Sequence, residues 1–141
     1  MSSSTDRLEV GYTKSLTVKV TDQMVQQFAD MSGDRNPIHL DDDYAAKTRF
    51  KRRIAHGMIS GALISRALVE LIGGGGVYLG QNLKFVNPIF IDDTIVITIK
   101  ITGIRREKGI AMVETNVAKE NGDMVVKGDA VIMVAPDFDH A

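Results

Sequence analysis

Residues 58–72 read MISGALISRALVELI and decide the fold of this 141-residue chain. The stretch is apolar nearly all round, and only Arg66 and Glu70 in it carry a charge. A surface helix keeps a polar face, so this pattern predicts a buried central helix instead. The run Gly73-Gly74-Gly75-Gly76 follows, and glycine there suits the end of the helix and a flexible turn better than a phosphate loop.

The sequence after this helix supplies strands to cover it. Asn121-Gly122 is a strong hairpin signal and Glu107-Lys108-Gly109 gives a second turn, so the last three strands form an antiparallel meander. We therefore predict one α+β domain over residues 1–141, with a curved antiparallel sheet wrapped around a central helix, which is the hot-dog fold. The segments with strand patterns are 77–86, 94–104, 110–119 and 124–134.

The residues before the central helix predict a strand, a helix and a loop. Residues 15–20 alternate polar and apolar side chains as a half-buried strand does, and residues 1–14 are expected to be a loose segment. Thr21 and Asp22 can cap a helix that Gly33 ends. Residues 32–37 have loop chemistry, and three aspartates after them place negative charge at the start of a short helix near residues 44–47.

The composition excludes several classes of function. Seventeen Lys plus Arg against eighteen Asp plus Glu give a net charge of -1, which does not steer the molecule to nucleic acid or to a membrane. The absence of cysteine excludes disulfides and a thiolate nucleophile, and it fits a reducing compartment. No secretion signal is recognised in MSSSTDRLEV, so a cytoplasmic location is expected.

Two short motifs carry the chemistry. They are Phe28-Ala29-Asp30-Met31-Ser32-Gly33-Asp34-Arg35-Asn36-Pro37-Ile38-His39 and Ala55-His56-Gly57-Met58. Together they resemble the hydratase motif of the MaoC-like, (R)-specific enoyl-CoA hydratases. The order of strand, motif, central helix and later strands is similar to that family across nearly the whole chain. The resemblance implies the addition of water to trans-2-enoyl-CoA, giving (R)-3-hydroxyacyl-CoA.

The resemblance also implies a site. Asp34 and His39 would hold the reacting water, and the backbone N–H of Gly57 would lie near the thioester oxygen. Ser65 matches a serine near the same pocket of the family, and Met58 and Asn36 complete the candidates for substrate binding. Asn36 also has a structural interpretation, because an asparagine before Pro37 shapes a turn.

The residues support this chemistry without the family. Hydration needs a base for the water, a proton for the α-carbon and stabilisation of enolate charge, and a carboxylate with an imidazole can supply the first two. The start of the central helix offers free N–H groups for the third need. Asp34 could instead only cap its loop, and His39 could be an ordinary half-buried histidine. We interpret His56, at the helix start where a cation is unfavourable, as a neutral structural histidine.

Other candidate contacts follow from the charge pattern. The basic residues could meet the phosphates of coenzyme A or be a solvated face, and the pattern does not choose among them. We expect no metal, because the aspartate run suits a helix start and no second histidine sits at ligand spacing from His39. No cofactor is expected, since coenzyme A is part of the substrate, and relatives resembling this chain imply a homodimer. The basic residues are Lys47, Arg49, Lys51, Arg52 and Arg53, and the candidates for the floor of the acyl tunnel are Leu68, Val69, Leu71 and Ile72.

Three rival functions stay open at this point. A 3-hydroxyacyl-ACP dehydratase runs the same chemistry in reverse on another carrier, although its usual helix glutamate does not fit Glu70. A hot-dog thioesterase would release free thiol. A non-catalytic acyl-thioester binding module is the third, because one fold hosts many functions.

Overall fold

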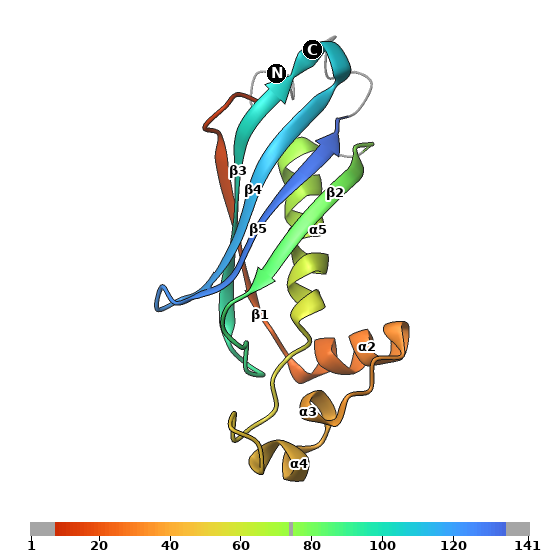
Figure 1. The fold of residues 1–141 in the computed structure, drawn as a ribbon, viewed down its shortest axis with the longest axis vertical. Helices are drawn as coiled ribbons and strands as arrows, with labels where there is room; N and C mark the ends of the chain where they lie inside the picture. The colour runs from red at the N-terminus through yellow and green to blue at the C-terminus, as the bar shows by residue number, and fades with distance from the viewer. Residues whose placement is uncertain (1–7, 74, 135–141) are drawn as a thin grey trace.

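The computed structural model describes residues 8–73 and 75–134. Its sheet has five strands in the order β1-β3-β4-β5-β2, with antiparallel pairing throughout. Helix α5 runs along one face of this sheet, and the three shorter helices gather at the end where α5 begins (Figure 1). The predicted α+β hot-dog arrangement is confirmed. The elements are β1 (Thr13–Lys19), α2 (Asp22–Ser32), α3 (Pro37–Leu40), α4 (Asp42–Ala46), α5 (Gly57–Ile72), β2 (Val77–Phe85), β3 (Thr94–Arg105), η1 (Arg106–Lys108), β4 (Ile110–Lys119) and β5 (Met124–Met133).

The meander of the last three strands is confirmed as well. Strand β3 pairs with β4, and β4 pairs with β5. Gly122, in the turn between β4 and β5, has φ of 96°, a left-handed conformation that glycine adopts without steric cost. The hairpin prediction from Asn121-Gly122 therefore had a sound physical basis.

The core lies between α5 and the sheet. Alternate residues of β3 from Ile95 to Ile101 point to the helix, and these four isoleucines are fully buried, as are the inward residues of β4. From the helix come Ile59, Leu63, Ile64, Ala67 and Leu68, all of them buried. This single cluster fixes the position of the first turn of α5 relative to the sheet.

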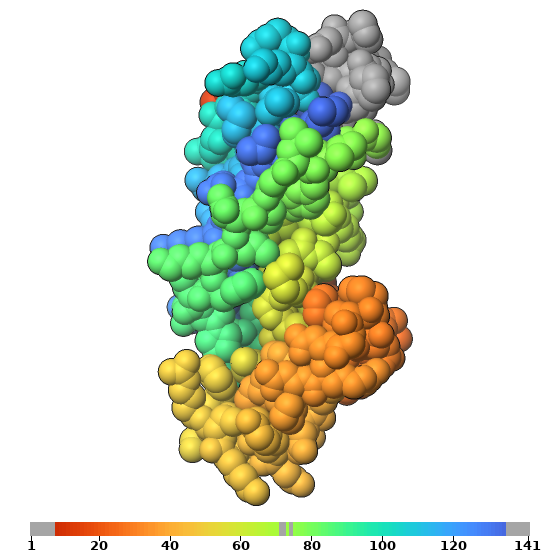
Figure 2. Space-filling model, turned by 45° about the vertical axis from the view of Figure 1, so that its right-hand side comes forward, coloured from red at the N-terminus to blue at the C-terminus, as the bar shows by residue number. Residues whose placement is uncertain are grey.

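The cover of α5 is less complete than the sequence predicts. Met58 is 54% exposed and Val69 is 56% exposed, because one sheet covers only one side of a helix. In Figure 2 residues of α5 stay visible at the surface between β2 and α2. The apolar side of α5 that faces away from the sheet is thus open in the single chain.

The loose segment expected over residues 1–14 extends too far along the chain, because ordered structure begins before residue 14. Leu8 is fully buried, and its carbonyl accepts a hydrogen bond from Arg106 at 3.0 Å. Strand β1 starts at Thr13, where its pairing with β3 begins. Residues 1–7 lie outside the described part of the chain. No helix within the described residues is long and apolar enough to cross a membrane.

Candidate active site

The turn between α2 and α3 is built from its own side chains. The Ser32 hydroxyl accepts from the N–H of Asp34 at 3.0 Å, and Asp34 Oδ1 accepts from the N–H of Asn36 at 3.3 Å. Asn36 Oδ1 in turn caps α3 by accepting from the N–H of Ile38 at 3.2 Å. Pro37 opens that short helix with a fixed φ. The turn therefore brings Asp34 and His39, five positions apart in the sequence, to the same place.

His39 is held with one ring nitrogen free. Its side chain is 9% exposed, and Nδ1 lies 2.8 Å from the carbonyl oxygen of Ile54. A carbonyl only accepts, so Nδ1 carries the hydrogen and Nε2 of the neutral ring is left as an acceptor. Burial lowers the pKa of His39 below its ordinary value of 6.5, and His56 lowers it further, whereas the Ile54 carbonyl and Asp34 oppose the shift. His39 is therefore a neutral base near pH 7.

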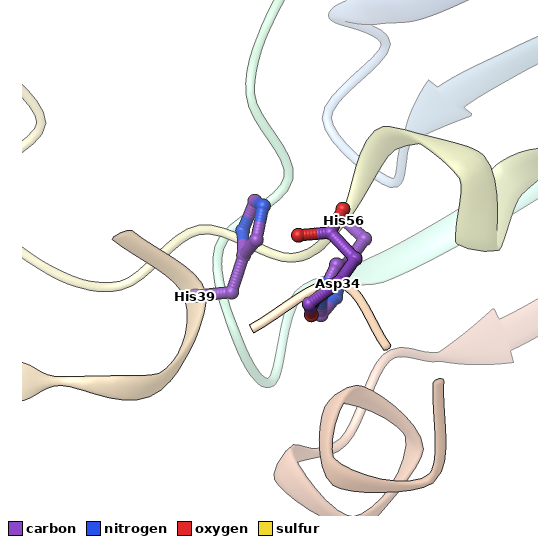
Figure 3. Close-up of side chains that lie close together, drawn as sticks. All are labelled: Asp34, His39 and His56. Carbon is purple, nitrogen blue, oxygen red and sulfur yellow. The ribbon is translucent and has the colours of Figure 1, made fainter. Parts of the chain in front are cut away.

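His56 ties the start of α5 to the turn. It is 2% exposed, and its Nε2 donates to the backbone carbonyl of Asp34 at 2.9 Å. Its ring also lies 3.9 Å from the ring of His39 and 4.7 Å from that of Phe28, measured between centroids. Figure 3 shows the side chains of Asp34, His39 and His56 close together. The buried hydrogen bond makes His56 a positioning residue for the loop that carries Asp34.

The three side chains also form a candidate ligand group. One ligand atom from each of Asp34, His39 and His56 can be chosen so that all lie within 4.8 Å of one another. The sequence shows no second histidine at ligand spacing from His39, but this argument against a metal does not hold in space, because His56 is distant only along the chain. One nitrogen of each imidazole is already hydrogen-bonded to a backbone carbonyl, so both rings are fixed in orientation. Rings fixed in this way suit a bound water as well as a bound ion.

A cavity of about 370 Å³ adjoins His39. Gly57, Met58 and Ser60 line it from the first turn of α5, and Phe85 lines it from the end of β2. A Cβ on Gly57 would lie 2.9 Å from the Phe85 ring, so a side chain at this position would displace that ring. The first N–H groups of a helix have no partner within it, which leaves the N–H of Gly57 available near the cavity.

The remaining predicted site residues are not all in this cavity. Met58 lines it, whereas Asn36 is exposed and uses its side-chain oxygen to cap α3. Ser65 lines a separate pocket of about 90 Å³, two turns further along α5, together with Leu68 and Val69. The side chains of Leu71 and Ile72 lie outside the described part. The single chain thus does not bring Ser65 to His39.

Sequence reasoning missed Ser60 and Phe85 as cavity residues. Both are ordinary apolar-pattern positions, and only the packing of β2 across the first turn of α5 reveals them. Ser60 is fully buried, and its hydroxyl has no hydrogen-bond partner among the described residues. A serine inside an apolar helix pattern is a weak signal of a cavity residue. The reason is that a buried hydroxyl without a hydrogen-bond partner is uncommon in a packed core.

We expect Ser60→Ala to stabilise the protein. Removing an unsatisfied buried hydroxyl should raise the free energy of unfolding by about 1 kcal/mol. Urea unfolding measures this, with Ser15→Ala as the control, because the Ser15 hydroxyl is exposed and hydrogen-bonded to Thr98. A loss of stability in Ser60→Ala would contradict the prediction and would mean that bound water satisfies the hydroxyl.

The comparisons with known proteins match this arrangement. The family model described as "MaoC like domain" matches residues 4–122. The chain belongs to the MaoC-like family. Among MaoC-like relatives it is similar to the (R)-specific enoyl-CoA hydratase of Aeromonas caviae, with 39% identity over 92% of this chain and 97% of that protein. It is also similar to the 3-hydroxybutyryl-CoA dehydratase of Methylorubrum extorquens, with 37% identity over 90% of this chain and 81% of the relative.

A solved structure gives the same result for the MaoC-like fold. The unliganded R-hydratase PhaJ1 from Pseudomonas aeruginosa superposes with a TM-score of 0.88 and 42% identity. The match covers 93% of this chain and 84% of that chain. The resemblance inferred from the two motifs is therefore confirmed at the level of the family and the fold.

Proposed function

We propose that this MaoC-like protein hydrates trans-2-enoyl-CoA to (R)-3-hydroxyacyl-CoA, with Asp34 and His39 as the acid–base pair. The observation that carries the proposal is the placement of a carboxylate within 4.8 Å of an imidazole whose Nε2 is free, beside a cavity. Relatives named as enoyl-CoA hydratase and 3-hydroxybutyryl-CoA dehydratase support a hydro-lyase activity. The (R) configuration rests on the names of the relatives alone.

The mechanism needs no covalent intermediate. The pair accepts a proton from the water, and the hydroxide oxygen bonds to C3 of the enoyl group. The charge that develops on the thioester oxygen is met by the N–H of Gly57 at the amino end of α5. The pair then returns the proton to C2, so that the product contains all the atoms of one water. One pair acting on one side of the substrate adds hydrogen and hydroxyl to the same face.

The direct test is a hydration assay with crotonyl-CoA. Loss of the ultraviolet absorbance of the conjugated enoyl thioester, without release of free thiol, would support hydration and exclude a thioesterase. Chiral analysis of the product tests the configuration, and a mainly (S) product would overturn that part. Absence of turnover with both CoA and carrier-protein thioesters would favour a non-catalytic binding module.

The pH dependence of kcat/KM provides a prediction about His39. The neutral imidazole is the active form, and its lowered pKa means that this form persists to lower pH than for an ordinary histidine. We expect activity to fall on acidification with a midpoint below 6.5, in assays with crotonyl-CoA between about pH 5 and 8. A midpoint above 6.5 would contradict His39 as a buried neutral base.

We also propose a homodimer joined through β2, in the cytoplasm. Within residues 8–73 and 75–134, strand β2 is an edge of the sheet and pairs with β5 alone, and Val77, Leu79 and Phe85 on it are at least half exposed. An apolar edge strand next to the open side of α5 favours pairing with a second copy. Sedimentation of the protein tests this, and a monomer at micromolar concentration would contradict it. The absence of cysteine supports the reducing compartment.

A further inference from the structure

The described residues that line the active-site cavity carry a single permanent charge. Among the described residues that line it, Arg49 is the one side chain that is charged at every physiological pH. Its other polar lining residues are His39, Ser60 and Asn87, and the rest are apolar or glycine. Arg49 is exposed to solvent, so it lies where the cavity meets the surface. A cavity whose lining is neutral apart from one cation at its exposed side suits a ligand with an apolar part and an anionic part.

The structure separates Arg49 from the other basic residues. Arg53 is only 13% exposed and is neutralised by Asp22 at 2.7 Å and Asp42 at 3.1 Å. Arg52 lies 4.0 Å from the ring centroid of Phe90 and does not line the cavity, and neither do Lys47 and Lys51. Arg53 therefore holds α2 and α4 to its own segment, and only Arg49 among these five cations lines the cavity.

Arg49 has no carboxylate partner among the described residues. Its guanidinium lies 4.9 Å from the ring centroid of Phe50, which also lines the cavity. A cation on an aromatic face keeps its N–H donors free at the ring's edge, and stacking limits the conformations of the long side chain. The guanidinium is thus partly ordered, unpaired and able to bind a phosphate through two parallel hydrogen bonds.

We propose that Arg49 binds a phosphate group of the coenzyme A part of the substrate. The inference rests on the proposed function, because it assigns the anionic part of the same substrate. The acyl group and the pantetheine arm occupy the cavity beside His39 and Gly57. The nucleotide lies outside, where its phosphates meet Arg49.

The test compares Arg49→Gln with the parent on two thioesters of one acyl group. With crotonyl-CoA, KM should rise about tenfold while kcat stays nearly unchanged, as expected for one lost charge-assisted contact away from the reacting atoms. With the crotonyl thioester of pantetheine, which has no phosphate, the parent and the variant should have the same KM. The control is Arg52→Gln, which removes the same charge from the same segment outside the cavity and should change neither KM.

Several outcomes would overturn the proposal. These are an unchanged KM for crotonyl-CoA in Arg49→Gln, an equal rise with both thioesters, or an equal rise in Arg52→Gln. A larger effect on a crotonyl carrier-protein thioester than on crotonyl-CoA would assign Arg49 to the other carrier. Crotonyl dephospho-CoA, which lacks the 3′-phosphate and keeps the diphosphate, shows which phosphate is bound. Arg49→Gln raises the KM for this substrate only if Arg49 contacts the diphosphate.

A binding measurement separates this proposal from the proposed function. Calorimetric titration with coenzyme A needs no turnover, and Arg49→Gln should weaken this binding by the same factor as it raises KM. If the parent hydrates neither thioester, the proposed function fails, and the titration still decides the role of Arg49. Equal affinity of the parent and of Arg49→Gln for coenzyme A would overturn the proposed phosphate contact of Arg49.

Discussion

Asp34→Asn should reduce kcat/KM for crotonyl-CoA by about 10²–10⁴-fold without changing the fold. The substitution removes the negative charge that accepts the proton of the water. It retains a side-chain oxygen, and this oxygen can still accept from the N–H of Asn36, which holds the turn. The hydrogen bond of His56 goes to the backbone carbonyl of Asp34 and is also retained. The loss of activity would therefore report the carboxylate itself.

The control for Asp34→Asn is Asp43→Asn. Asp43 is exposed in the first turn of α4, so its substitution removes the same charge nearby and outside the cavity. We expect the control to keep the activity of the parent, and both variants to unfold at the temperature of the parent. Full activity in Asp34→Asn would remove this residue from the mechanism.

His39→Asn should cause a loss of about 10²–10⁴-fold in kcat/KM as well. An asparagine amide can place its nitrogen near the position of Nδ1, so the hydrogen bond to the Ile54 carbonyl can be kept. The basic Nε2 has no counterpart in asparagine, and the water loses its second acceptor. The measurement is the same hydration assay, accompanied by thermal unfolding to show that the buried site remains intact.

The variant with both substitutions shows whether the two residues act together. If Asp34 and His39 handle one water, the double variant should lose about as much activity as the more damaging single variant. Losses that multiply would instead indicate independent roles. Such a result would contradict the single shared water, although it would leave both residues essential.

Much of the fold could be predicted because its signals are local. The strand predicted at residues 110–119 is β4 in the structure, and the one predicted at 124–134 ends one residue earlier at Met133. The central helix could be predicted because residues 58–72 lack the polar face of a surface helix, and the glycines that follow predict where it ends. The exposed side of α5 could not be predicted, because a buried pattern does not show whether the same chain or another chain provides the cover.

The candidate site was only partly predictable. Asp34 and His39 are close in sequence, and their turn is made by neighbouring side chains, so spacing could find them. His56 reaches the same place only through the packing of α5 against the α2–α3 turn, a contact between distant segments. For the same reason, sequence alone could not show that Ser65 lines another pocket or that Arg53 is already paired.

The hydrogen bond from His56 to the Asp34 carbonyl has a consequence for heat inactivation. His56 precedes α5 directly, so the loop with the carboxylate is anchored to the helix that packs on the sheet and forms the core with it. A loop anchored in this way does not melt ahead of the domain. Catalysis and folding should therefore be lost together on heating, and no temperature range should exist in which the enzyme is folded but inactive.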